Sequence, residues 1–129
     1  MLINCTNHPY EIWSKLQREA ADVYGSVVDL PFPLIEPLMN QEELRRLVKE
    51  YSDIIERQTP NAVLVAGEFT FSFMLVDKLL SDGIKVLCTC SKRITTEVKR
   101  ADGTNEKNAV FMFEGFREYG YYEKRDNGR

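Results

Sequence analysis

Several motifs that identify common enzyme classes are missing from this sequence. Its 129 residues contain no GxxxxGK[ST] phosphate loop, no GxGxxG dinucleotide fingerprint and no GxSxG nucleophile elbow. The only histidine is His8, and the three cysteines form no CxxC pair. These absences exclude an ordinary P-loop NTPase, a classical dinucleotide enzyme and a usual zinc site. We expect neither a metal nor a cofactor.

The sequence also lacks a long apolar run and an excess of positive charge. No segment approaches the roughly 20 apolar residues that span a bilayer, and residues 1–11 have neither the basic region nor the apolar region of a signal peptide. The net charge is -3 and the pI is about 5.3, so no overall basic field attracts long nucleic acid. We expect a cytoplasmic protein that binds neither a membrane nor long nucleic acid, with Cys5, Cys88 and Cys90 reduced and serving as small apolar side chains.

The hydrophobic pattern that is present predicts alternating strands and helices. Near-continuous apolar runs at 1–6, 61–66 and 84–90 are typical of strands covered on both faces, and a further strand is expected at 26–33. Helices are expected at 10–24, from residue 40 onward and at 70–80. This order predicts a Rossmann-like α/β fold, with a mainly parallel sheet flanked by helices.

Local signals set the helix boundaries. Asn40 with Glu43 three residues later predicts a capped start for the second helix, and Gly83 is expected to close the third. The first helix is expected to bury one stripe of residues, made of Ile12, Trp13, Leu16, Ala20, Val23 and Tyr24, and to stop at Gly25.

The character of the chain changes after residue 93. Two β-rich stretches surround Asp102-Gly103, which predicts an antiparallel β-hairpin over 94–116 that extends the sheet. We expect residues 1–119 to form a single α/β domain and residues 120–129 to form a polar C-terminal tail that frays at its end.

Polar and cationic residues follow the predicted strands, where ligands bind in an open parallel sheet. These residues are Thr6-Asn7-His8-Pro9, Asp29, Gly67-Glu68-Phe69-Thr70 and Ser91-Lys92-Arg93. Residues 85–100 carry a local charge of +4 and are the one basic stretch in an acidic chain. The pattern makes a phosphate-bearing ligand plausible and leaves the function open.

Each candidate also has a structural alternative. His8 with Pro9 is consistent with a helix cap, and Glu68 near a helix N-terminus gains about 0.3–1 kcal/mol from the helix dipole. Gly67 is consistent with a tight turn, and Lys92 with Arg93 is consistent with a solvated pair. The aromatic residues of this region, Phe69, Phe71 and Phe73, are more typical of a core than of a stacking platform.

Five segments of the sequence resemble one known group of proteins. The segments are "MLINCTNHP" followed by Trp13, "DLPFP", "GEFTF", "CSKR" and the closing "FREY". They are similar to small type III CRISPR-associated proteins, the compact ring nuclease-like families whose Rossmann-like fold is related to CARF domains. The similarity covers about residues 1–119.

The resemblance implies a homodimer that binds a cyclic oligoadenylate second messenger, above all cyclic tetra-adenylate, and linearises it to switch off antiviral signalling. Such enzymes need no metal, because a ribose 2′-hydroxyl attacks its own adjacent phosphate and leaves a 2′,3′-cyclic phosphate. The protein aligns the reacting atoms and stabilises the developing charge.

Chemistry and position then suggest roles for the candidates. The catalytic set is His8 as general acid or base, with Arg93 or Lys92 stabilising the phosphorane. The ligand-binding set is Asn7, Gly67, Glu68, Phe69, Thr70 and Ser91, with Glu68 accepting from an adenine amino group or orienting a cation. Two rival hypotheses stay open: a protein that sequesters or senses the cyclic nucleotide without cutting it, and a sensor or adaptor domain whose sheet edge or terminal hairpin binds another protein.

Overall fold

The computed structural model describes residues 1–124. Its elements in chain order are β1 (Leu2–Thr6), a 3-10 turn (Tyr10–Ile12), α1 (Lys15–Ala21), a second 3-10 turn (Asp22–Tyr24), β2 (Val27–Asp29), α2 (Gln41–Arg57), β3 (Ala62–Ala66), α3 (Phe69–Ser81), β4 (Val86–Lys99) and β5 (Asn105–Glu118). No helix among the described residues is long and apolar enough to cross a membrane.

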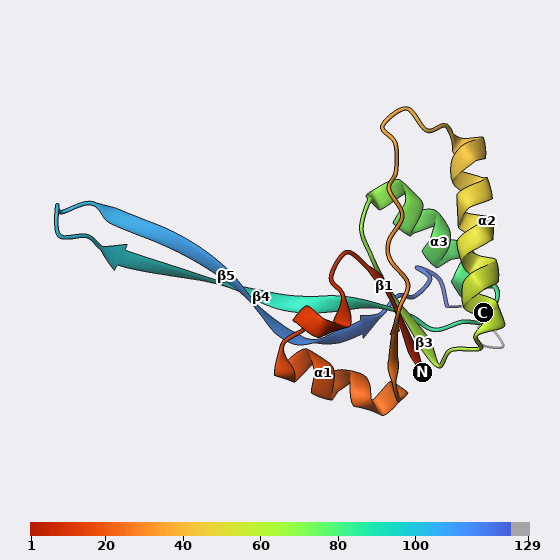
Figure 1. Ribbon diagram of the computed structural model, residues 1–129, viewed down its shortest axis with the longest axis horizontal. Coiled ribbons are helices and arrows are strands. Elements are labelled where there is room, and N and C mark those ends of the chain that lie inside the picture. Colours follow the sequence, from red (N-terminus) through yellow and green to blue (C-terminus); the bar gives the residue numbers. More distant parts are fainter. Residues whose placement is uncertain (125–129) are drawn as a thin grey trace.

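Five strands form one sheet in the order β2-β1-β3-β4-β5. The first four strands run parallel, and β5 is antiparallel to β4. Helix α1 covers one face of the sheet, whereas α2 and α3 cover the other (Figure 1). The predicted fold class, a mainly parallel α/β sheet extended by a C-terminal antiparallel hairpin, is confirmed.

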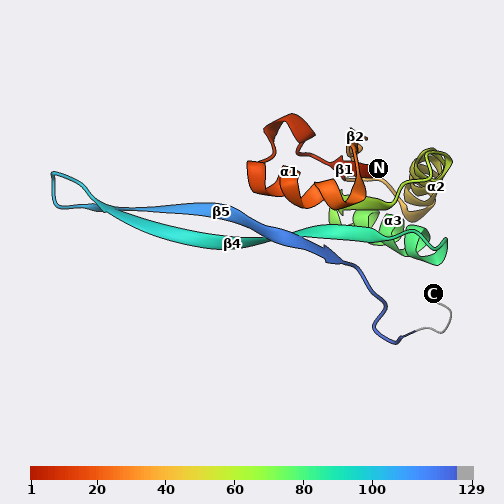
Figure 2. The same cartoon turned by 90° about the horizontal axis from the view of Figure 1, so that it is seen from below.

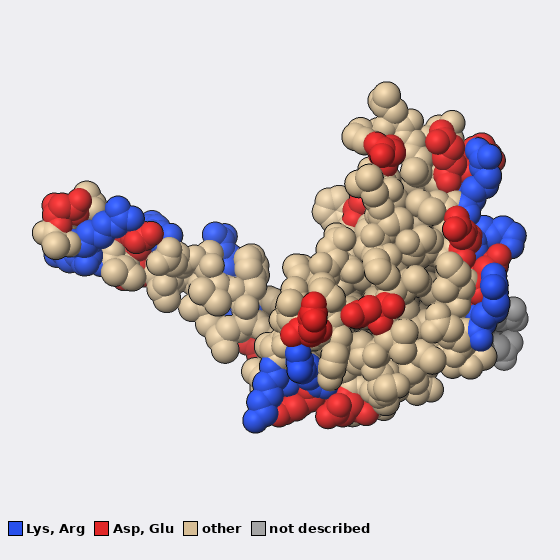
Figure 3. Space-filling view, in the orientation of Figure 1, with Lys and Arg blue, Asp and Glu red and all other residues tan. Residues whose placement is uncertain are grey.

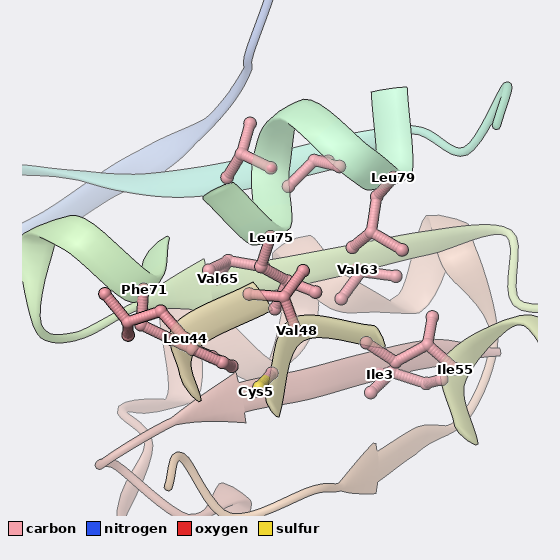
Figure 4. Packing of buried hydrophobic residues seen from close by; sticks show 12 residues of the cluster. Ile3, Cys5, Leu44, Val48, Ile55, Val63, Val65, Phe71, Leu75 and Leu79 are labelled. Atoms are coloured by element: carbon pink, nitrogen blue, oxygen red, sulfur yellow. The ribbon is translucent and has the colours of Figure 1, made fainter. Parts of the chain in front are cut away.

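The alternation of side chains along the central strands builds two hydrophobic layers. On one face Ile3, Val63 and Val65 pack against α2 and α3, as Figure 4 shows. On the other face Leu2 and Leu64 pack beneath the segment that contains α1. Because both faces are covered, these strands read as continuous apolar runs in the sequence.

Helices α2 and α3 begin and end close to where the sequence predicts. The Asn40 side chain accepts a hydrogen bond from the backbone N–H of Glu43, and the Glu43 carboxylate accepts one from the N–H of Asn40, which completes the expected capping box. Helix α3 ends just before Gly83, whose φ of 81° is a left-handed conformation that glycine adopts without strain.

The prediction of one helix over 10–24 is wrong. The backbone at Trp13 is extended, and the Ser14 side chain caps a new, shorter helix by accepting from the N–H of Gln17. Of the predicted stripe, Ile12, Leu16 and Val23 are exposed, and the buried side chains on this side are Trp13 and Ala21. The break arises because Trp13 is held by the β1–α1 loop.

The prediction that the fourth strand ends at residue 90 is also wrong. Strand β4 continues without interruption to Lys99 and pairs with β5 along its whole length, with an irregularity in the register between Cys90 and Ser91. The turn at Asp102-Gly103 is where the sequence predicts it, with Gly103 at a φ of 88°. Residues 91–113, called the arm below, project away from the rest of the molecule (Figures 1 and 2).

Candidate functional site

The loop after β1 is held by a partly buried hydrogen-bond network centred on the backbone of His8. The His8 carbonyl accepts from Asn4 Nδ2 at 2.8 Å and from Trp13 Nε1 at 2.9 Å. The His8 N–H donates to Thr6 Oγ1 at 3.1 Å, and that hydroxyl donates to Asn4 Oδ1 at 2.8 Å. Both backbone groups of His8 are therefore fixed, while its side chain stays exposed.

Asn4 extends this network to the neighbouring strand. Its side chain is buried, and Nδ2 also donates to Asp29 Oδ1 at 2.8 Å, across the β1–β2 pair in which Asn4 lies opposite Asp29. The two carboxylate oxygens of Asp29 accept from the N–H of Tyr10 at 3.1 and 3.3 Å. Every polar group of the Asn4 side chain is thus satisfied, as a buried amide requires.

The exposed side chain of His8 lines a cavity of about 430 Å³ between α1 and the base of the arm, called the His8 cavity. Thr6 and Ser91 line the same cavity. Its apolar walls include Trp13, Phe111 and Phe113. The imidazole of His8, several hydroxyl-bearing side chains and several aromatic rings therefore line one cavity near the carboxyl end of β1.

Glu68 acts first as the cap of helix α3. Its carboxylate accepts from the N–H of Phe71 at 2.8 Å and from Thr70 Oγ1 at 2.6 and 2.7 Å. The hydrogen bond from the Thr70 hydroxyl, together with the one from the Phe71 N–H, lowers the pKa of the Glu68 carboxyl. Capping of the N-terminus of α3 therefore explains why Glu68 and Thr70 occupy these positions.

Gly67 makes room for an aromatic ring from a distant segment. A β-carbon at this position would lie 2.4 Å from Cζ of Phe32, and the Phe32 ring also packs edge-on against Phe71 at 5.2 Å. The φ of Gly67 is not positive, so glycine is required here by close approach and not by a left-handed turn. The segments "DLPFP" and "GEFTF" contact each other through this arrangement.

The residues around the start of α3 line a second hollow, of about 750 Å³, on the α2 and α3 face. Glu68, Phe69 and Thr70 border it opposite the loop around Pro37. The prediction that the aromatic cluster belongs to the core holds only for Phe71, which is fully buried, because Phe69 and Phe73 are exposed.

Asn7 borders a third and smaller hollow of about 240 Å³, which it shares with Asp29 and Phe32. Asn7 is therefore next to His8 in sequence but lines a different depression. The ligand-binding candidates of the sequence are consequently divided among three hollows, except for Gly67, which lines none of them.

Lys92 and Arg93 lie in the arm and not in a loop beyond the sheet. Both are exposed, and they pair across the ribbon with Met112 and Phe111. Side chains alternate along a strand, so Arg93 shares the face of Ser91 and Lys92 lies on the opposite face. Neither cation lines the His8 cavity.

The structure therefore brings His8 together with Ser91, and Glu68 together with Phe69 and Thr70, but it leaves Lys92 and Arg93 apart from both groups. Sequence reasoning assigned no role to Asn4, which organises the loop. The sequence feature that could have identified Asn4 is its position in the middle of an otherwise apolar run, because a polar side chain buried there needs a specific hydrogen-bond partner.

The cysteines and acidic residues of the described part of the chain offer no metal site. Burial raises the pKa of the Cys5 thiol to about 12, so this side chain stays neutral within the core. Within residues 1–124, no group of three or more His, Cys, Asp and Glu side chains is arranged to hold a metal ion.

Comparison with known proteins gives one match. A family model described as "Uncharacterized protein MJ1673 family" matches residues 1–117. No curated protein and no solved structure matches the chain. The matched range begins before β1 and includes the loop with His8, the start of α3 and the whole arm.

Proposed function

The chain belongs to the MJ1673 family, and we propose that it is a CRISPR-associated ring nuclease of the cytoplasm that binds a cyclic oligoadenylate and linearises it. Cyclic tetra-adenylate is the ring we propose. The observation that carries the proposal is the His8 cavity, in which the only histidine is held by its backbone beside a hydroxyl and aromatic walls.

The shape and lining of the His8 cavity suit part of a nucleotide ring. Its volume of about 430 Å³ falls in the range of about 300–1,000 Å³ that is typical of small-ligand pockets. Aromatic side chains such as Phe111 and Phe113 offer surfaces on which adenine bases stack. The hydroxyls of Thr6 and Ser91 offer hydrogen bonds to phosphate or ribose oxygens.

The proposed reaction uses the substrate's own nucleophile. A ribose 2′-hydroxyl attacks the adjacent phosphorus, the P–O5′ bond breaks, and the products are a 2′,3′-cyclic phosphate and a free 5′-hydroxyl. His8 transfers a proton, either from the attacking hydroxyl or to the leaving oxygen. The fixed backbone of His8 anchors the point from which the imidazole reaches the cavity, so only rotation about the side-chain bonds is left to order.

Product analysis at two ratios of protein to ring tests this proposal. We expect purified protein to convert a large molar excess of labelled cyclic tetra-adenylate into linear products ending in a 2′,3′-cyclic phosphate. An Arg46→Ala variant, altered on the exposed surface of α2, is the matched control and should cleave at the wild-type rate. Intact ring after prolonged incubation with excess protein would refute cleavage.

A second function is favoured by one feature of the same cavity. Among residues 1–124 no lysine or arginine lines the His8 cavity, so the described part of one chain supplies no cation to the charge that develops on phosphorus. Binding without cleavage, as in a sponge or sensor, fits that arrangement. Protection of the ring by stoichiometric protein, with no product at any ratio, would identify this function.

A further inference from the structure

The arm exposes apolar side chains that nothing in the described chain covers. Phe111 is 70% exposed, Val110 is 53% exposed and Val98 is 50% exposed. A two-stranded ribbon without further packing is marginally stable in water. The exposed apolar side chains of the arm are therefore available for contact with another surface.

The base of the arm continues into an apolar surface on the neighbouring helix segment. Ile12 and Leu16 are 61% and 56% exposed, and both line the His8 cavity together with Phe111 and Met112. These four residues are called the root patch below. Contiguous exposed apolar groups of this kind are typical of an interaction surface.

The charge of the arm complements that of the remaining chain. Residues 91–113 contain five cations and three carboxylates, a net charge of +2, whereas the whole chain has -3 and the remainder therefore has -5. Figure 3 shows Lys and Arg gathered along the arm. Only Arg100 has an ion-pair partner among the arm's cations within residues 1–124, namely Glu106 at 3.1 Å. A second copy offers the arm a surface of opposite charge.

The length of the arm also suits a second copy. Each strand of the arm contains about nine residues, which at about 3.3 Å per residue span roughly 30 Å. This reach is about the diameter of a small domain. The arm is too far extended to fold onto its own body, but it is long enough to lie across another.

We propose that two copies associate through their root patches about a two-fold axis, so that the arm of each lies along the body of the other and Arg93 enters the partner's His8 cavity. An isologous contact uses the same patch on both copies. Arg93 pairs with Phe111 of the root patch, so burying that patch brings its guanidinium to the partner. The assignment of Arg93 to the ligand rests on the proposed function, whereas the association does not.

The proposed dimer explains two observations. Within residues 1–124 the His8 cavity is lined by no cation, and Arg93 is exposed and has no ion-pair partner. A guanidinium offers a planar fork to phosphate oxygens. The site is thus incomplete in one copy and is completed by the arm of the other.

Sedimentation without ligand tests the association. We expect wild-type protein to sediment as a dimer of 15.0 kDa chains and Phe111→Asp to sediment as a monomer. Ile12→Asp, on the α1 side of the root patch, should give the same shift, which guards against a folding defect in one variant. Phe73→Asp is the matched control, because Phe73 is 78% exposed on the outer face of α3, and it should remain dimeric. A wild-type monomer, or loss of the dimer in Phe73→Asp alone, would overturn the proposal.

Mixing two inactive variants tests whether Arg93 acts on the partner's cavity. His8→Ala and Arg93→Ala should each lose cleavage, but a 1:1 mixture should recover roughly a quarter of wild-type activity, since half of the dimers are mixed and each has one intact site of two. No recovery from the mixture would place Arg93 and His8 in the same copy. If wild-type protein dimerises but does not cleave, the proposed function fails and the association stands.

Discussion

The ring of Phe32 occupies the space that a side chain at Gly67 would fill. A β-carbon at Gly67 would lie 2.4 Å from Cζ and 2.5 Å from Cε2 of that ring. The ring in turn packs edge-on against the fully buried Phe71. The loop after β2 is therefore joined to the start of α3 next to the sheet edge where the candidate residues lie.

Gly67→Ala should destabilise the protein by about 1–3 kcal/mol, because the methyl group forces the Phe32 ring out of its packing position. Urea denaturation measures the change in the free energy of unfolding. In a Phe32→Ala background the same substitution should cost much less, since the obstructing ring is gone. An equal cost in both backgrounds would show that the ring is not the cause.

Asn4→Leu should also be destabilising, by about 1–3 kcal/mol, because it removes the amide that joins the His8 carbonyl to Asp29 and takes one acceptor from the buried Thr6 hydroxyl. Asn61→Ala is the matched control: Asn61 Nδ2 also bonds a backbone carbonyl, that of Tyr24 at 2.8 Å, but Asn61 is exposed. Thermal unfolding should show a larger loss for Asn4. Similar losses of thermal stability in Asn4→Leu and Asn61→Ala would show that Asn4 does not organise the loop.

The capping carboxylate of Glu68 should make stability depend on acid pH. Its pKa is lowered from 4.5 in the folded state, mainly by the Thr70 hydroxyl and then by the Phe71 N–H. The stabilisation is therefore present above pH 4.5 and is lost as the pH falls through the lower folded-state value. The difference in unfolding free energy between wild type and Glu68→Gln should be larger at pH 7 than at pH 3.

Glu50→Gln serves as the control for that experiment, because Glu50 is an exposed carboxylate of α2 with no hydrogen bond within residues 1–124. If the free energy of unfolding depends on pH in the same way in wild type and Glu68→Gln, the hydrogen bonds of the cap do not stabilise the charged form of Glu68.

The sequence predicts the sheet well because both faces of it are buried. The runs at β1 and β3 could be recognised from composition alone, and the capping pair Asn40 and Glu43 marked the start of α2 correctly. The helix prediction failed at Trp13. There the indole N–H donates a hydrogen bond to the His8 carbonyl, and the backbone is extended within an otherwise helical pattern. Periodicity does not reveal a tertiary hydrogen bond.

His8 and Glu68 follow β1 and β3, whereas Lys92 and Arg93 lie within β4, so the sequence did not predict how the candidate residues are grouped. Ser91, Lys92 and Arg93 are adjacent in sequence, yet the continuation of β4 directs neighbouring side chains to opposite faces of the arm. A local run of β-branched residues does not show whether a strand stops at the sheet edge or continues beyond it. That distinction depends on the pairing with β5.

Cleavage of the ring should persist in EDTA. Within residues 1–124 no cluster of ligands could hold a metal ion, and the proposed nucleophile is the substrate's own hydroxyl. Initial rates should agree with and without the chelator at fixed ionic strength. Loss of cleavage in EDTA with recovery on adding Mn²⁺ would contradict this description of the site.

Single-turnover cleavage of cyclic tetra-adenylate by wild type and His8→Ala, with ring affinity measured on both proteins, tests the central claim most directly. General acid–base catalysis contributes about 10²–10⁴-fold to a rate, so His8→Ala should cleave at least about 10²-fold more slowly at saturating protein. Its affinity for the ring should change far less, because the loss falls on the transition state. A wild-type cleavage rate in His8→Ala, or an affinity loss equal to the rate loss, would contradict the account.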